Sequence, residues 1–128
     1  MQLTRGGGNE AVESLDGKFV YYHRDDDQAV WKIPATGGEE KRVVEQVATG
    51  YWSLLRDGIC FLNPSHKPDP AFEYFEFSTG KRKAFAIVPD IHGTFGAPAF
   101  TASPDGRWVL CVRADHVESS IQIAEDFR

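Results

Sequence analysis

Short runs of apolar residues alternate with polar positions along the chain, and turn-forming residues separate the runs. The stretch 99–113 is the clearest case, because a Ser-Pro-Asp-Gly turn at 103–106 lies between two apolar runs. Proline fixes the backbone at the first turn position and glycine tolerates a positive φ, so this stretch predicts a hairpin. Related hairpins are predicted around the turns at 14–17 and 55–58.

The three hairpins belong to one repeat. Their turn aspartates, Asp16, Asp57 and Asp105, recur at intervals of roughly 40–50 residues, which is the period of propeller blades with four strands each. No stretch has a sustained 3.6-residue apolar period, so almost no helix is expected. We therefore predict an all-β fold of three four-stranded antiparallel propeller blades in a single segment. The expected blades are residues 10–49, 50–93 and 94–128.

Four strands are expected in each of the first two blades and only three in the third, which ends where the turn to its fourth strand should begin. A spare strand, residues 2–5, stands before the first blade and is followed by three glycines. A flexible tail is one interpretation of this segment. We interpret it instead as the fourth strand of the third blade, because in closed propellers the first strand of the chain completes the last blade and locks the ring. The other expected strands are residues 10–14, 18–24, 29–34 and 41–47, then 51–55, 58–63, 71–78 and 82–88, then 97–102, 107–113 and 120–125.

Three blades do not close a ring, since propellers typically have four to eight. The outer faces of the first and third blades, with Tyr22, Trp31 and Trp108, would stay uncovered. An exposed apolar face of about 500 Å² costs about 12 kcal/mol at about 25 cal/mol per Å², which rivals the stability of a whole domain. Two kinds of cover for these faces are possible. One is further blades of a longer protein, and the other is a homodimer that closes a six-bladed ring with residues 2–5 pairing between copies. We expect the homodimer.

Composition fits a soluble globular chain, with 41% hydrophobic and 26% charged residues. The net charge of -5 gives no reason to expect a nucleic-acid or membrane partner. No apolar run approaches the roughly 18 residues that span a bilayer, and the N-terminus lacks the apolar core of a signal peptide. Cys60 and Cys111 lie in apolar strands and are expected to be free and buried, with a disulfide or a metal-binding or reactive role as alternatives. The cellular compartment stays undecided.

The sequence contains no recognisable catalytic or cofactor motif. A Gly-x-Ser-x-Gly nucleophile elbow and a phosphate-binding glycine loop are both missing. The histidines His23, His66, His92 and His116 have no metal-ligand spacing and are expected at loops or strand ends. The acidic tip at 25–27 lacks the calcium-loop pattern and is interpreted as a solvated turn. We therefore expect no catalytic residue, metal or cofactor.

Three stretches, 13–22, 30–40 and 103–112, resemble the TolB-type, WD-like β-propeller repeat. Its hallmarks here are Ser-Pro-Asp-Gly-Arg before a blade's second strand, and Val-Trp-Lys-Ile-Pro followed by Thr-Gly-Gly-Glu-Glu. The second blade departs from the pattern, because 55–58 lacks the proline and the loop at 64–70 is longer. The resemblance implies the C-terminal part of a larger bacterial propeller protein, with a role in sensing or protein interaction. It supplies no catalytic residues.

Propellers bind ligands at the central channel or at the rim, and the first strand of each blade lines the channel. The stretches 9–12, 50–52 and 95–98 occupy that position in this chain. For each candidate the alternative role is packing at the channel mouth. We expect a non-enzymatic scaffold or sensing module for protein or small-ligand binding. The candidate ligand-binding residues are Glu10, Tyr51, Trp52 and Phe95.

Two other functions stay open at this point. A propeller hydrolase or lyase could use channel carboxylates such as Glu10 and Glu13 as general acid and base, although a surface strand explains both residues equally well. The chain could also be an excised fragment without a function of its own. An activity screen with alanine at both glutamates separates the first alternative from the binding module.

Overall fold

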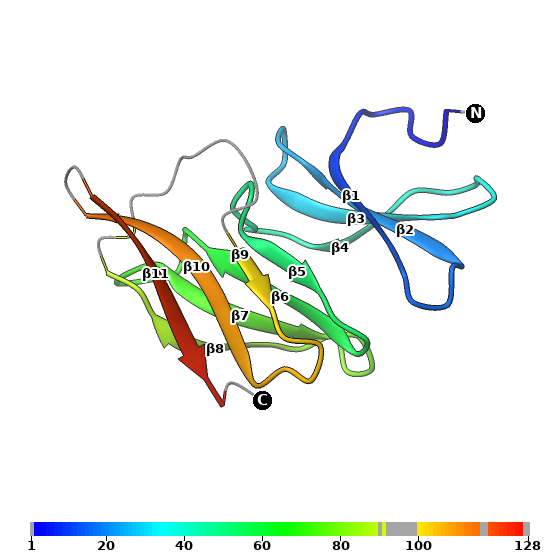
Figure 1. Ribbon diagram of the computed structural model, residues 1–128. Coiled ribbons are helices and arrows are strands. Elements are labelled where there is room, and N and C mark those ends of the chain that lie inside the picture. Colours follow the sequence, from blue (N-terminus) through cyan, green and yellow to red (C-terminus); the bar gives the residue numbers. More distant parts are fainter. Residues whose placement is uncertain (1, 90, 92–99, 116–117, 127–128) are drawn as a thin grey trace.

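The computed structural model describes residues 2–89, 91, 100–115 and 118–126, and within these ranges the chain forms eleven strands and no helix (Figure 1). The strands form three antiparallel sheets, in which strands that follow each other in the chain pair side by side. This arrangement confirms the all-β prediction. The strands are β1 (Asn9–Glu13), β2 (Phe19–Arg24), β3 (Ala29–Pro34) and β4 (Lys41–Val44) in sheet A; β5 (Trp52–Leu54), β6 (Gly58–Asn63), β7 (Ala71–Glu76) and β8 (Arg82–Ile87) in sheet B; and β9 (Phe100–Ala102), β10 (Trp108–Asp115) and β11 (Glu118–Glu125) in sheet C.

Strand ends agree with the sequence pattern to within a few residues, with one clear difference at β4. That strand was expected to reach residue 47 and ends at Val44. Gln46 adopts a positive φ of 62°, and the N–H of Val47 donates to the carbonyl of Gln28 at 2.8 Å instead of to a sheet partner. The chain therefore leaves sheet A early and crosses toward sheet B. Residues 97–99, expected at the start of β9, lie outside the described residues.

The turn before the second strand of a sheet is built in the same way in sheets A and C. The Ser103 hydroxyl donates to Asp105 at 2.7 Å and accepts a hydrogen bond from the N–H of Arg107 at 3.0 Å. Ser14 donates to Asp16 at 2.7 Å in the corresponding turn. These serine hydroxyls lower the pKa of both aspartates, so the turns hold carboxylates that stay ionised. The Ser-x-Asp-Gly pattern specifies the hairpin locally.

Sheet B has a shorter turn at this place, without serine, closed by the equivalent backbone hydrogen bond. The N–H of Leu55 donates to the carbonyl of Gly58 at 2.8 Å, as the N–H of Ser103 donates to that of Trp108 at 2.9 Å. Glycine is required at position 58, because a Cβ there would lie 2.0 Å from the carbonyl oxygen of Phe75. Gly58 and Trp108 are therefore equivalent positions of the repeat, although the sequence motif is degraded in sheet B.

Sheets A and B pack face to face through an apolar cluster. At its edge, the buried Glu73 accepts a hydrogen bond from Arg82 at 2.7 Å and another from Asn63. Arg82 also donates to the carbonyl of Glu45 at 3.0 Å, which ties the start of β8 to the segment that follows β4. Both oxygens of the Glu73 carboxylate are thus satisfied within the contact, as a buried carboxylate requires. The cluster consists of Tyr21, Val30, Val44, Val47, Trp52, Ile59 and Phe61.

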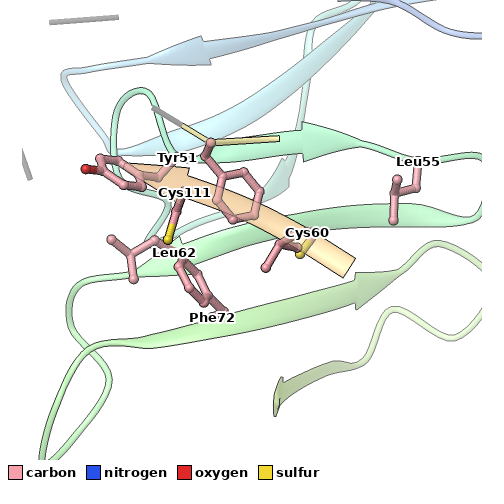
Figure 2. Packing of buried hydrophobic residues seen from close by; sticks show 8 residues of the cluster. Tyr51, Leu55, Cys60, Leu62, Phe72 and Cys111 are labelled. Carbon is pink, nitrogen blue, oxygen red and sulfur yellow. The ribbon is translucent and has the colours of Figure 1, made fainter. Parts of the chain in front are cut away.

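Sheets B and C pack through a second cluster, in which Cys60, Leu62 and Phe72 of sheet B face Cys111 of sheet C (Figure 2). The two cysteines are free and buried, as expected. Burial raises the pKa of the Cys60 thiol, so this side chain acts as a small apolar group. Strand β6 is buried along its whole length, because alternate residues belong to the two clusters. Each sheet therefore uses its next neighbour to cover one face.

Residues 2–5 contain no strand, in contrast to the sequence-based expectation. The N–H of Arg5 donates to Glu40 at 3.3 Å, and Gly8 lies directly against the ring of Tyr22. The outer face of sheet A is therefore covered by the N-terminal segment, and Tyr22 is only 1% exposed. The expected exposure of Tyr22 is wrong, because a segment of the same chain takes the place of a neighbouring sheet. Pairing of residues 2–5 with sheet C of a second copy stays a prediction.

Candidate functional site

The beginnings of β1 and β5 meet at the junction of sheets A and B. The indole N–H of Trp52 donates to the Glu10 carboxylate at 2.9 Å, although 42 positions separate the residues. Trp52 is buried, and the Glu10 side chain keeps 24% of its surface exposed. Two of the four candidate residues thus come together, with one carboxylate oxygen engaged by the partner strand.

Glu10 adopts a backbone conformation that side chains rarely take, with φ at 53°. The register of β1 against β2 shifts at the same place, between Asn9 and Val12. A left-handed residue other than glycine costs about 1–2 kcal/mol, so neighbouring contacts have to hold it. The hydrogen bond from Trp52 is one such contact. The bulge turns the Glu10 carboxylate toward β5.

His23 lies beneath this pair and is fully buried in β2. Its Nε2 is 2.8 Å from the carbonyl of Val47, and a carbonyl only accepts, so Nε2 carries a proton. Its Nδ1 is 3.1 Å from Asp25 and 4.0 Å from Glu10. The sequence pattern did not indicate this burial, because the acceptor comes from the segment between β4 and β5. The imidazole ties three separate segments together.

Asp25 is the outer partner of His23. It accepts hydrogen bonds from Thr49 at 3.0 Å and from Asn9 at 2.8 Å. The Thr49 bond, followed by the Asn9 bond and the nearby His23, holds the pKa of this carboxyl below its usual value of 3.8. Asp27 accepts from the indole of Trp31 at 3.0 Å. The acidic tip at 25–27 is therefore partly engaged in internal contacts and is not simply a solvated turn.

The other two candidates lie elsewhere. Tyr51 is 3% exposed within the contact of sheets B and C, and its hydroxyl donates to the carbonyl of Val112 at 3.2 Å. Burial raises the pKa of the Tyr51 phenol. Phe95 lies outside the described residues. Adjacent residues of a strand point to opposite faces, which explains why Tyr51 and Trp52 serve different contacts.

A cavity of about 940 Å³ opens at the opposite rim, among the turns that precede β2, β6 and β10. Leu15 forms part of its wall and is 82% exposed, which is unusual for an apolar turn residue. Three carboxylates and one guanidinium also line it, so its charge is negative. Apolar residues at turn positions are the signal in the sequence that could have indicated it. Other lining residues are Glu13, Leu54, Asp57, Phe77 and Ala102.

The described part of the chain holds no group of three or more His, Cys, Asp or Glu side chains placed to bind a metal ion. Across the same ranges, the structure contains no helix long and apolar enough to cross a membrane.

Comparison with known proteins finds no matching family model and no matching curated protein. Solved structures do match. TolB from Acinetobacter baumannii is 16% identical, with a TM-score of 0.68 over 95% of this chain and 31% of its own. A putative TolB from Agrobacterium tumefaciens is 15% identical, with a TM-score of 0.64 over 96% of this chain and 46% of its own. Prolyl oligopeptidase B from Galerina marginata is 13% identical, with a TM-score of 0.58 over 93% of this chain and 19% of its own.

The chain therefore spans less than half the length of each of these structures. At such low identity the likeness concerns the fold alone. Combined with the repeated antiparallel meanders and their face-to-face packing, it identifies the architecture: the chain has a TolB-like β-propeller fold.

Proposed function

We propose that the chain is a non-enzymatic β-propeller module that binds a protein segment or small ligand in the rim cavity. The observation that carries this proposal is that turns from all three sheets line one cavity of about 940 Å³. Large concave sites with apolar walls and a few polar groups are typical of binding sites. Leu15 offers an exposed apolar contact at its edge. The channel-mouth residues Glu10 and Trp52 are proposed as a second, smaller contact.

The charge of the cavity defines the ligand class. Glu13, Asp16 and Asp57 bring three carboxylates, against the single guanidinium of Arg56. The preferred ligand therefore combines an apolar group with a positive charge, as in a short peptide with a leucine or phenylalanine beside a lysine. Such a ligand would place its apolar side chain near Leu15 and its ammonium near the carboxylates.

A hydrolase or lyase that uses Glu10 and Glu13 is the alternative function. The likeness to a prolyl oligopeptidase concerns the fold alone, so it does not decide between this alternative and the binding module. The indole N–H of Trp52 already engages one carboxylate oxygen of Glu10. This bond supports a structural role for Glu10 at the junction of sheets A and B rather than a catalytic one. Screening the parent chain against broad hydrolase and lyase substrates, beside Glu10→Ala/Glu13→Ala, tests the choice. Parent activity that the double substitution abolishes would overturn the non-enzymatic proposal.

Binding is tested by NMR with a panel of short apolar–lysine peptides. We expect shift changes to gather at Val12, Leu54 and Ala102, which line the cavity. Leu15→Ser should weaken binding, because it removes the exposed apolar contact without changing the charge of the cavity. Ile87→Ser is the matched control, since Ile87 is 50% exposed and lies on β8, away from the cavity. Equal loss in both variants, or shifts spread over the whole surface, would contradict the proposed site.

A further inference from the structure

The repeat assigns an equivalent position to one residue in the third strand of each sheet. Val30, Phe72 and Ile121 each pair with the fifth residue of the preceding strand. Val30 belongs to the cluster between sheets A and B, and Phe72 to the cluster between B and C. Each points toward the sheet that follows its own. By the same register, Ile121 points to where a further sheet would follow sheet C.

Exposure separates the three equivalent residues sharply. Val30 is 0% and Phe72 2% exposed, whereas Ile121 is 73% exposed. Ile123, two residues further along the same face of β11, is 60% exposed. Side chains that are core residues in two sheets are thus left open to water in the third. This face of sheet C, which we call the open face, has the composition of a contact between sheets and no cover among the described residues.

The opposite end of the arc carries a matching face. Val20 and Tyr22 occupy the positions at which Ile59 and Phe61 of sheet B contact sheet A. Here residues 2–8 lie over the face and leave a cavity of about 240 Å³ against it. Sheet A therefore carries the apolar set that receives a preceding sheet, covered by a short segment.

The Glu40 carboxylate lies where the cover meets sheet A. Glu40 accepts hydrogen bonds from the Tyr22 hydroxyl and from Arg24, each at 2.8 Å, and a longer one from the N–H of Arg5 at 3.3 Å. Only the last of these three bonds comes from the cover itself. The cover otherwise rests on packing of Leu3, Thr4 and Gly8 near Tyr22, and removal of residues 2–8 would expose Val20 and Tyr22.

We propose that two copies of this chain close one six-bladed ring, in which the open face of each copy packs on sheet A of the other. Residues 2–8 then leave sheet A, and residues 2–5 pair with β11 of the partner as its fourth strand. Among the described residues β11 pairs only with β10, so its second edge is available. Twofold symmetry covers both ends at once, and six blades lie within the usual range.

The repeat supports a second copy as the occupant, because the open face and sheet A carry the two halves of the contact that joins neighbouring sheets. The contacts between A and B and between B and C supply the template, since the same residue positions are used in each. The ring closure is independent of the proposed ligand cavity, which lies at the rim and not on the outer faces.

Solution mass tests the contact. At tens of micromolar, multi-angle light scattering should give twice the protomer mass for the parent and the protomer mass for Ile121→Glu/Ile123→Glu. Leu15→Glu is the matched control and should stay dimeric, since Leu15 is also exposed and lies away from the open face. Circular dichroism verifies that all three are folded. A monomeric parent overturns the proposal and leaves the open face to blades elsewhere in a longer polypeptide. A dimer that survives the double substitution also overturns it.

Strand exchange is tested by disulfide formation between separately labelled copies. Thr4→Cys in one copy and Gln122→Cys in the other should form a covalent pair under mild oxidation. Thr79→Cys, on the exposed turn after β7, replaces Gln122→Cys as the control and should not cross-link. Both variants carry Cys111→Ser, because Cys111 lies directly opposite Gln122 across β10 and β11, whereas the native Cys60 is buried. A dimer without the 4–122 cross-link would overturn the exchange of residues 2–5 and leave only the face contact.

Discussion

Trp52 donates its indole N–H to Glu10 at 2.9 Å, and this bond joins the first strand of sheet B to the first strand of sheet A. It is a polar contact at the edge of an apolar cluster, and it holds a residue whose φ of 53° is unfavourable by itself. The bond connects two sheets at the side where their strands enter the structure. The stability of the A–B contact should therefore depend on it.

Glu10→Ala should lower the free energy of unfolding by about 1–3 kcal/mol, because the buried indole N–H of Trp52 loses its acceptor. Glu10→Gln retains an acceptor oxygen and should cost less. Urea unfolding followed by Trp fluorescence measures both. Glu39→Gln is the control, since Glu39 is exposed. An alanine variant as stable as the parent would show that the hydrogen bond does not support the junction.

Gly8→Ala should release the N-terminal cover from sheet A. A Cβ at Gly8 would lie 2.5 Å from a ring carbon of Tyr22, and φ at 156° is itself unfavourable for alanine. A penalty of about 1.4 kcal/mol corresponds to a tenfold change in the open population. Trypsin cleavage after Arg5 should therefore speed up roughly tenfold or more.

Gly7→Ala is the matched control for that variant. Its φ of 79° also strains alanine, but a Cβ there meets nothing within 4 Å. The cleavage rate should rise much less than in Gly8→Ala. Equal rates in the two variants would mean that the ring of Tyr22 does not hold the segment.

Asp25 should make the fold sensitive to acid. Its pKa is lower in the folded chain than the usual value of 3.8, so its contribution is fully present well above pH 3.8 and is lost as the pH falls through the folded value. Asp25→Asn should be less stable than the parent at pH 6, and the difference in Tm should shrink between pH 4 and pH 2. Thermal scans across that interval measure it. Asp26→Asn should run parallel to the parent, and a Tm gap for Asp25→Asn that does not change with pH contradicts the prediction.

Ser103→Ala should destabilise sheet C by about 1–2 kcal/mol. The buried Ser103 hydroxyl donates to Asp105 and accepts from the N–H groups of Arg107 and Trp108. The N–H of Trp108 would lose this acceptor, whereas that of Arg107 keeps Asp105. Urea unfolding gives the change, with Ser78→Ala as a control at an exposed serine that contacts only Glu76 through its hydroxyl. Similar losses in the two variants would argue against a special role of the turn.

Local chemistry explains which features the sequence predicts well. The turns at 14–17 and 103–106 follow from serine, aspartate and glycine acting within a few residues, and the structure forms both. The continuous apolar run in 58–63 predicts a strand, and burial on both sides follows from its position between two sheets. The same reasoning finds β7 and β8, so most of the architecture can be derived from short-range pattern.

Long-range contacts explain the rest. The burial of His23 depends on the carbonyl of Val47, which is 24 positions away, and no spacing in the sequence indicates that meeting. Residues 2–5 have the pattern of a strand, but they lie over Tyr22 because Glu40 and the glycines provide a place for them. Glu10, Tyr51 and Trp52 were predicted at one site, whereas Tyr51, directly before β5, turns to the opposite face of sheet B.

Cross-sheet packing is the central claim, and aromatic NOEs test it most directly. Tyr21 and Phe77 stack at 5.6 Å between ring centroids across the A–B contact, and Phe72 and Phe100 lie 5.3 Å apart across the B–C contact. We predict strong NOEs between the ring protons of both pairs in the folded chain. Detection of contacts within each sheet but of neither aromatic pair would contradict the account.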